Sequence, residues 1–144
     1  MRPHPYLRAY MAGIVVPTLI LLVSMTVFAC FHFYFEVPSQ FVLEMPARPL
    51  ERAIVFPMAI VPNLWGLWNM LYLAVRSRVR LPLGLHGALL PLFLIPGGVA
   101  LARVLDVFTI QLHYALPIIP IGMAVYYLAW KFAVEFLNEE MGIA

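Results

Sequence analysis

The chain alternates between long apolar stretches and short clusters of charge. Four stretches contain no Asp, Glu, Lys or Arg, namely residues 9–35, 53–75, 81–102 and 107–130. A helix needs about 20 predominantly apolar residues to cross the hydrocarbon core of a bilayer, and each stretch is long enough. The stretches are apolar on every side instead of alternating in polarity, which argues against the strands of a membrane barrel. The pattern therefore predicts an all-α, polytopic membrane protein with four transmembrane helices.

The predicted helices cover about residues 10–35, 50–75, 81–104 and 110–136 of a single domain that spans residues 1–144. The only sizeable loop is residues 36–49, on the outer side of the membrane. The boundary between the third and fourth helices is poorly marked, because no Gly or Pro occurs there to break the helical pattern.

Prolines lie near the middle of the last three predicted helices. Pro62 is near the centre of the second helix, Pro91 is near the centre of the third, and Pro117 and Pro120 straddle the centre of the fourth. An interior proline removes a backbone donor and frees the carbonyl group four residues earlier. We therefore expect helices 2–4 to be kinked. Broken helices line the substrate sites of transporters, although neighbouring helices can also re-satisfy the backbone at an ordinary kink.

The distribution of basic residues predicts the orientation of the chain. If the N-terminus is cytoplasmic, six of the nine Lys and Arg residues lie inside and three lie outside. The inner set is Arg2, Arg8, Arg76, Arg78, Arg80 and Lys131, and the outer set is Arg48, Arg52 and Arg103. The positive-inside rule therefore places both termini on the cytoplasmic side of a bacterial inner membrane or an equivalent one.

Three of these arginines alternate in the turn between the second and third helices. Arg76, Arg78 and Arg80 are the strongest determinant of orientation, because they hold this turn at the cytoplasmic surface. They are also candidates for contact with anionic lipid or another phosphate group.

Composition supports the same class of protein. Hydrophobic residues make up 64% of the chain and charged residues 11%, whereas a soluble domain carries about 25% charged residues. The net charge of +2 and the lack of a basic patch interleaved with aromatics outside the membrane argue against a nucleic-acid partner. The single cysteine, Cys30, excludes an internal disulfide or a CxxC redox pair.

Polar and aromatic side chains gather in the second predicted helix. Asn63 and Asn69 flank a glycine at three-residue spacing, and Trp65 and Trp68 form a neighbouring strip. In a functional interpretation the amides line a polar cavity, a tryptophan walls it, and His86 of the third helix reaches Asn69. In a structural interpretation the amides join helices and the aromatics pack or face lipid. The sequence does not separate the two.

A metal or haem site is a further hypothesis. His32 and Glu36 lie one helical turn apart at the outer end of the first helix, and His113 is predicted on the same side. Two histidines and a carboxylate can bind a transition metal, and two histidines can ligate haem. The alternative is that these are polar side chains near the headgroups. Apart from this option, no cofactor is expected.

Several function classes lack their characteristic residues. No Asp or Glu lies deep in a predicted span, which disfavours a carboxylate-driven proton antiporter. No Gly-rich phosphate loop, potassium filter or nucleophile–base pair is recognisable, so an enzyme is not favoured. We expect a homo-oligomeric transporter or channel for a small neutral or lipid-like solute. The alternative is an accessory or scaffolding subunit of a larger membrane complex, and a metal- or haem-binding membrane protein comes third.

Overall fold

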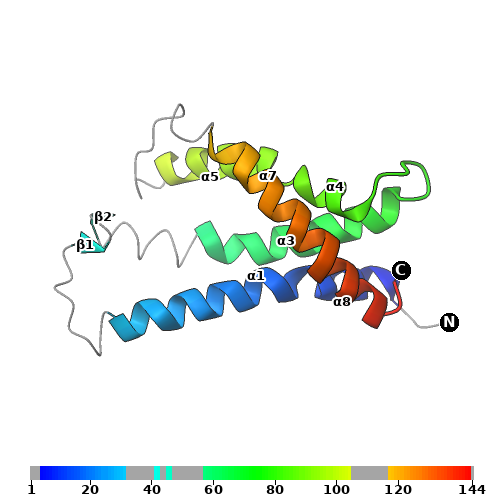
Figure 1. The fold of residues 1–144 in the computed structure, drawn as a ribbon, viewed down its shortest axis with the longest axis horizontal. Coiled ribbons are helices and arrows are strands. Elements are labelled where there is room, and N and C mark those ends of the chain that lie inside the picture. The colour runs from blue at the N-terminus through cyan, green and yellow to red at the C-terminus, as the bar shows by residue number, and fades with distance from the viewer. Residues whose placement is uncertain (1–3, 32–40, 43–44, 47–56, 105–116, 144) are drawn as a thin grey trace.

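The computed structural model describes residues 4–31, 41–42, 45–46, 57–104 and 117–143, and most of these are helical. The first two helical units are α1 (Pro5–Ala29) and α3 (Pro57–Val75). The third unit consists of α4 (Leu83–Ala88) and α5 (Pro91–Val104). The fourth runs continuously through α7 (Ile118–Leu128), the π-helix η2 (Ala129–Val134) and α8 (Glu135–Glu140). The four units pack as a bundle (Figure 1), as the helical pattern predicted.

A short antiparallel pairing lies within the predicted outer loop. β1 (Phe41–Val42) pairs with β2 (Met45–Pro46), with Val42 opposite Met45. This two-residue hairpin lies at one end of the bundle (Figure 1), which we call the hairpin end. Both termini and the turn between α3 and α4 lie at the opposite end, which we call the terminal end.

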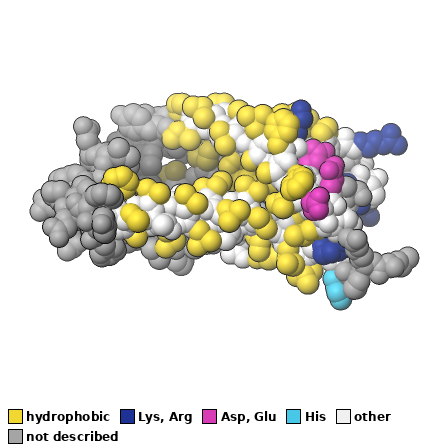
Figure 2. Space-filling view, turned by 60° about the horizontal axis from the view of Figure 1, so that its bottom comes forward, with side chains coloured by type: hydrophobic (Ala, Val, Ile, Leu, Met, Phe, Trp, Pro, Cys, Tyr) yellow, Lys and Arg dark blue, Asp and Glu magenta, His cyan; other side chains and the backbone are white. Residues whose placement is uncertain are grey.

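Three of the four units are long and apolar enough to cross a membrane, judged by length and composition. They are Pro5–Ala29, Leu83–Leu101 and Ile118–Glu140. The remaining unit, α3, contains a shorter apolar helix over residues Ile60–Val75. Figure 2 shows hydrophobic side chains over the helical surface and charged side chains gathered at one end. An apolar exterior of this kind is favourable in lipid and unfavourable in water.

The observed helix bounds differ from the predicted ones at both ends of the chain. α1 begins at Pro5, where a proline suits the first helical position because its missing N–H has no intrahelical acceptor. The last helix continues to Glu140, beyond the predicted end near residue 136. Residues 50–56 and 110–116, which were predicted to begin the second and fourth helices, lie outside the described residues.

The prolines have different consequences from one helix to the next. The third unit is interrupted at Leu89 and Leu90, immediately before Pro91, which has no N–H group to continue the helical hydrogen bonds. α3 continues on both sides of Pro62. The prediction for the fourth helix is wrong in position, because Pro117 is the N-cap of α7 and Pro120 lies in its first turn. Prolines are tolerated there, since the first turn has free N–H groups anyway.

Close backbone contact joins α1 to α3. A Cβ atom added to Gly13 would lie 2.7 Å from the carbonyl oxygen of Trp65 and 2.8 Å from the Cα atom of Gly66. The two helices therefore touch at their backbones, and only glycine fits at this crossing. This contact holds α1 along α3, and the fourth unit also packs against α1, through η2 and α8.

Candidate functional site

A pair of buried amides joins three helical units near the terminal end. Asn69 of α3 is 1% exposed, and its Nδ2 donates to the carbonyl oxygen of Ala9 and to Oδ1 of Asn138, both at 2.8 Å. Asn138 of α8 donates back to Asn69 Oδ1 at 3.2 Å. Both donor hydrogens of the Asn69 amide are therefore used within the bundle. This geometry matches the structural interpretation of Asn69, in which the amide joins helices.

A second reciprocal contact joins α3 to α4. Trp68 Nε1 donates to the carbonyl oxygen of His86 at 2.9 Å, and His86 Nε2 donates to the carbonyl oxygen of Trp68 at 3.0 Å. The two rings stack with their centroids 5.0 Å apart. His86 is 5% exposed and also meets the rings of Tyr72 and Trp130. The imidazole is thus packed among aromatic rings, and Trp68 satisfies its Nε2 nitrogen.

Trp65 and Trp130 form the centre of the bundle. Their ring centroids are 5.4 Å apart, and Trp130 is fully buried. Space for Trp130 exists only because residue 87 is glycine, since a Cβ atom there would lie 2.0 Å from Cγ of the indole. Trp65 also packs on Tyr126, with ring centroids 4.8 Å apart. Trp65 therefore belongs to the core and does not line an open polar cavity.

Asn63 lies apart from this cluster. It is exposed, and its Oδ1 accepts a hydrogen bond from the hydroxyl of Tyr10 on α1. The structure therefore brings together Trp65, Trp68, Asn69 and His86, and it leaves Asn63 on the surface beside α1. Neither asparagine lines the apolar groove that opens beside α3.

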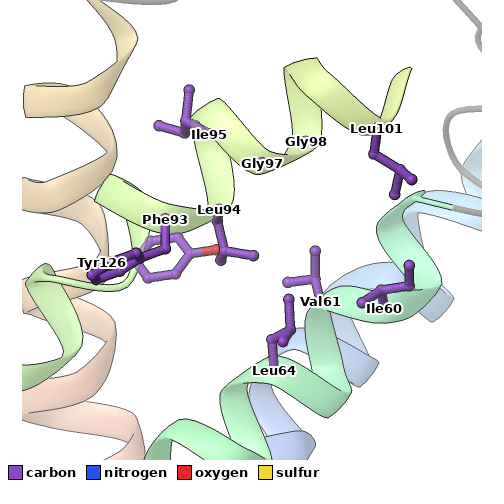
Figure 3. Close-up of a pocket in the computed structure, with 10 residues that line it drawn as sticks. All are labelled: Ile60, Val61, Leu64, Phe93, Leu94, Ile95, Gly97, Gly98, Leu101 and Tyr126. Carbon is purple, nitrogen blue, oxygen red and sulfur yellow. The ribbon is translucent and has the colours of Figure 1, made fainter. Parts of the chain in front are cut away.

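An apolar groove opens between α3, α5 and α7, towards the hairpin end. Its volume is about 360 Å³. The lining residues are Ile60, Val61, Leu64, Phe93, Leu94, Ile95, Gly97, Gly98, Leu101 and Tyr126. Figure 3 shows Leu94 and Leu101 pointing from α5 towards Val61 and Ile60 of α3. We call this feature the α3–α5 groove, and among its described lining residues the only side-chain polar atom is the Tyr126 hydroxyl.

Two adjacent glycines make part of the groove wall. A Cβ atom added to Gly97 or to Gly98 would have no atom within 4 Å other than those of its own helix and its neighbours in the chain. The backbone of α5 is therefore uncovered there, in contrast to Gly87 of α4, which lies against the indole of Trp130. An apolar molecule in the groove could approach this backbone closely.

At the terminal end, two arginines hold the last described residues of the chain. Arg76 Nη1 donates to the carbonyl oxygen of Ile143 at 2.7 Å, and Arg8 Nη1 donates to the carbonyl oxygen of Met141. Gly142 has a φ of 64°, and Ile143 N–H donates to the carbonyl oxygen of Asn138 at 2.8 Å. These are the features of a Schellman cap, in which glycine adopts the left-handed conformation after a helix.

The other two arginines of the turn differ from Arg76. All three arginines are exposed, but unlike Arg76, neither Arg78 nor Arg80 has a side-chain hydrogen bond or ion pair with another described residue. Carboxylates at the same end, Glu139 and Glu140 of α8, are exposed as well. The three arginines were predicted as one group, and the structure divides them into one whose side chain is bonded to Ile143 and two whose side chains have no bonded partner among the described residues.

The proposed metal or haem ligands cannot be placed. His32, Glu36 and His113 lie outside the described residues. Within the described part of the chain, no group of three or more His, Cys, Asp or Glu side chains could hold a metal ion. The metal or haem hypothesis therefore stays a prediction.

Sequence reasoning missed three features of these sites. Asn138 lies beyond the predicted end of the fourth helix and was not singled out, although it is the partner of Asn69. The glycine and isoleucine that follow α8 were a readable signal for a Schellman cap, since Gly142 suits the left-handed position and Ile143 the apolar contact after it. The α3–α5 groove had no clear signal beyond the adjacent glycines.

Comparison with known proteins gives no relative: no family model, no curated protein and no solved structure matches the chain.

Proposed function

We propose that the chain is a four-span integral membrane protein that binds a small, lipid-like solute in the α3–α5 groove and transports it as a homo-oligomer. The observation that carries this proposal is the groove itself, about 360 Å³ in volume with an almost wholly apolar lining. Ligand sites commonly have volumes of about 300–1,000 Å³, with mostly apolar walls and a few polar groups. Here the Tyr126 hydroxyl is the one polar side-chain group available to orient a ligand.

The internal hydrogen bonds favour an apolar cargo over a polar one. Asn69 and Asn138 bond to each other, and Trp68 and His86 bond to each other's backbone. A polar solute would have to compete for these groups or enter the groove without partners, and an unpaired polar group in an apolar site costs about 1–3 kcal/mol. A lipid-like solute avoids this cost.

Irregular backbone in the flanking helices supports movement of the groove walls. The third unit is interrupted at Leu89 and Leu90, close to the groove residue Phe93. The fourth unit contains the π-helix η2 directly after the helix that carries Tyr126. Breaks and π-helical turns often occur at functional sites, and they let one half of a helix move against the other.

We place the terminal end on the cytoplasmic side of a bacterial inner membrane or an equivalent membrane. Both termini and the arginine-rich turn share this end (Figure 1), in line with an even number of crossings. The positive-inside rule then orients the bundle, because more Lys and Arg residues are assigned to this end than to the other.

A groove-filling substitution tests the proposed binding. Gly98→Leu places a side chain where an added Cβ meets nothing within 4 Å, so it should fill the groove without disturbing the fold. Ala100→Leu adds comparable bulk at an exposed position of α5 that does not line the groove. We would reconstitute the natural chain and both variants with a photoactivatable fatty acid and map the labelled residues by mass spectrometry.

We expect the fatty acid to label Leu94 and Leu101 in the natural chain and in Ala100→Leu. Gly98→Leu should lose at least about nine-tenths of that labelling, because its side chain occupies the site, while its helical circular dichroism stays unchanged. Equal labelling in all three proteins, or labelling spread evenly over the exposed face of α1, would contradict a groove site.

An accessory or scaffolding role is the second candidate, and one observation favours it. Gly97 and Gly98 leave the α5 backbone open, which is the kind of surface against which another membrane helix packs closely. Purification in a mild detergent separates the two roles. A stoichiometric foreign subunit that is lost in Gly98→Leu would support the accessory role, and a homo-oligomer that keeps its fatty-acid site would support transport.

A further inference from the structure

We infer that Arg78 and Arg80 form a binding surface for the phosphate headgroups of anionic phospholipids, whereas Arg76 serves the chain's own C-terminal segment. The inference rests on the proposed membrane location and not on the α3–α5 groove. The three arginines alternate in one turn, yet only Arg76 has a side-chain hydrogen bond to another described residue.

Arg76 is committed to an intramolecular contact. Its Nη1 donates to the carbonyl oxygen of Ile143 at 2.7 Å. Ile143 is 5% exposed and packs with Ala9 and Ala12 of α1, so the segment that Arg76 holds is itself docked. A guanidinium bound to a docked carbonyl is less available to an external phosphate than a free one.

Arg78 and Arg80 are presented by a short, hydrogen-bonded turn. The N–H groups of Arg78 and Val79 both donate to the carbonyl oxygen of Val75 at 2.9 Å, and Leu81 N–H donates to that of Val79 at 2.8 Å. This network keeps the two arginines close together in a short connection between two membrane helices. Such a turn does not have to be ordered when a ligand binds, which lowers the entropic cost of binding.

The composition of the turn suits the boundary between headgroups and hydrocarbon. Val79 lies between the two arginines and is 54% exposed, so an apolar side chain accompanies two cationic ones. Long arginine side chains can lay their stems along the apolar layer and keep the guanidinium among the headgroups. The turn directly follows α3 and precedes α4, which places it at the end of two proposed spans.

The charges nearby leave the site open to an anion. Glu135, Glu139 and Glu140 lie on α8 at the same end of the molecule, and among the described residues none of them pairs with Arg78 or Arg80. Figure 2 shows the acidic and basic side chains near this end. An arginine offers a planar fork of donors that fits two phosphate oxygens at once, which lysine cannot do.

The experiment measures lipid binding directly. The detergent-purified full chain would be titrated with phosphatidylglycerol and with phosphatidylcholine, and bound lipid counted by native mass spectrometry. The variants are Arg78→Gln, Arg80→Gln and the charge-conserving double variant Arg78→Lys/Arg80→Lys. Lys131→Gln is the matched control, since it removes one cation whose ammonium lies over the rings of Tyr127 and Phe132, outside the turn.

We expect the natural chain to prefer phosphatidylglycerol, and each single glutamine variant to lose affinity for it about fivefold, as for one cation near an anionic surface. The double lysine variant should keep the general charge attraction to the lipid. It should lose part of the preference for phosphatidylglycerol, because lysine lacks the planar fork of donors of arginine. Lys131→Gln should change binding by less than about twofold.

Three results would overturn the inference. The first is equal binding of the two lipids by the natural chain, and the second is an equal loss of affinity in Lys131→Gln. The third is displacement of the lipid by soluble glycerol phosphate at the concentration at which the lipid itself binds, since that would identify a free phosphate site in place of a lipid surface. Because both arginines are exposed, the variants are expected to fold, and helical circular dichroism checks this.

Discussion

The two ends of the bundle are built by opposite means. Near the terminal end, side chains from α1, α3, α4 and α8 share hydrogen bonds, and Asn69 and Asn138 are almost fully buried. Towards the hairpin end, the α3–α5 groove keeps an apolar opening, and a Cβ atom added to Gly97 or Gly98 would meet no atom of the described residues packed against α5 within 4 Å. The same chain therefore contains a closed, bonded half and an open, apolar half.

This difference indicates that the polar residues of this chain serve to join its helices. In lipid there is little hydrophobic force between helices, so close packing and hydrogen bonds between helices hold them together. This chain concentrates close packing and interhelical hydrogen bonds at the terminal end, where Gly87 leaves space for the Trp130 ring. The half that contains the α3–α5 groove contributes fewer of these contacts, so its surface is available for a ligand or a partner.

Alanine substitutions at two glycines, one in each half of the bundle, should differ most in their effect on stability. In Gly87→Ala the new Cβ would lie 2.0 Å from the Trp130 indole, whereas in Gly98→Ala it meets nothing. Over-packing a buried site costs about 1–3 kcal/mol or more, so we expect Gly87→Ala to lose at least about 3 kcal/mol of stability. Gly98→Ala should be neutral or slightly stabilising, because alanine favours a helix. Unfolding by steric trapping in bicelles measures both.

That pair also tests the comparison itself. Equal stability losses in the two variants would mean that the halves are packed alike. A stable Gly87→Ala protein with unchanged tryptophan fluorescence would show that the Trp130 ring does not pack closely against residue 87.

A smaller effect is expected from the buried amide pair. Asn69→Ala and Asn138→Ala should each cost about 1–2 kcal/mol, because each leaves the other amide buried with fewer partners. The double variant should cost less than the sum, with a coupling of about 0.6–1.7 kcal/mol, as for hydrogen bonds between membrane helices. Asn63→Ala, at an exposed position, should cost under about 0.5 kcal/mol.

The double-mutant cycle decides the role of the amides. Strictly additive losses for Asn69 and Asn138 would contradict the contact between α3 and α8. A loss in Asn63→Ala as large as that in Asn69→Ala would mean that Asn63 stabilises the bundle as much as the buried amide does, which would contradict its exposed position.

The sequence predicted the helical fold well, since the length of an apolar run reports directly on membrane spans. It located Asn69 and His86 as the polar residues to watch, yet it could not name the partner of Asn69. Asn138 is 69 residues away, and a contact at that separation depends on how helices cross, which no local pattern records. For the same reason the α3–α5 groove was not predicted, because it exists between helices.

The prolines show where pattern reasoning is weakest. Pro91 interrupts its helical unit and Pro62 does not, although both lie inside apolar stretches. The difference depends on how neighbouring helices support the backbone. Pro117 was assigned to a helix centre because the boundary before it had no marker, and the structure places it at the start of α7.

Spin labels in nanodiscs would show whether the groove half lies open to lipid while the terminal half is closed. In a Cys30→Ser background, one label would be placed at Gly98 and another at Ala88, which is 6% exposed. Power-saturation electron paramagnetic resonance should find position 98 mobile, accessible to oxygen and shielded from a water-soluble nickel complex, and position 88 immobile and shielded from both. Equal immobility at the two positions, or access of nickel to position 98, would contradict the account.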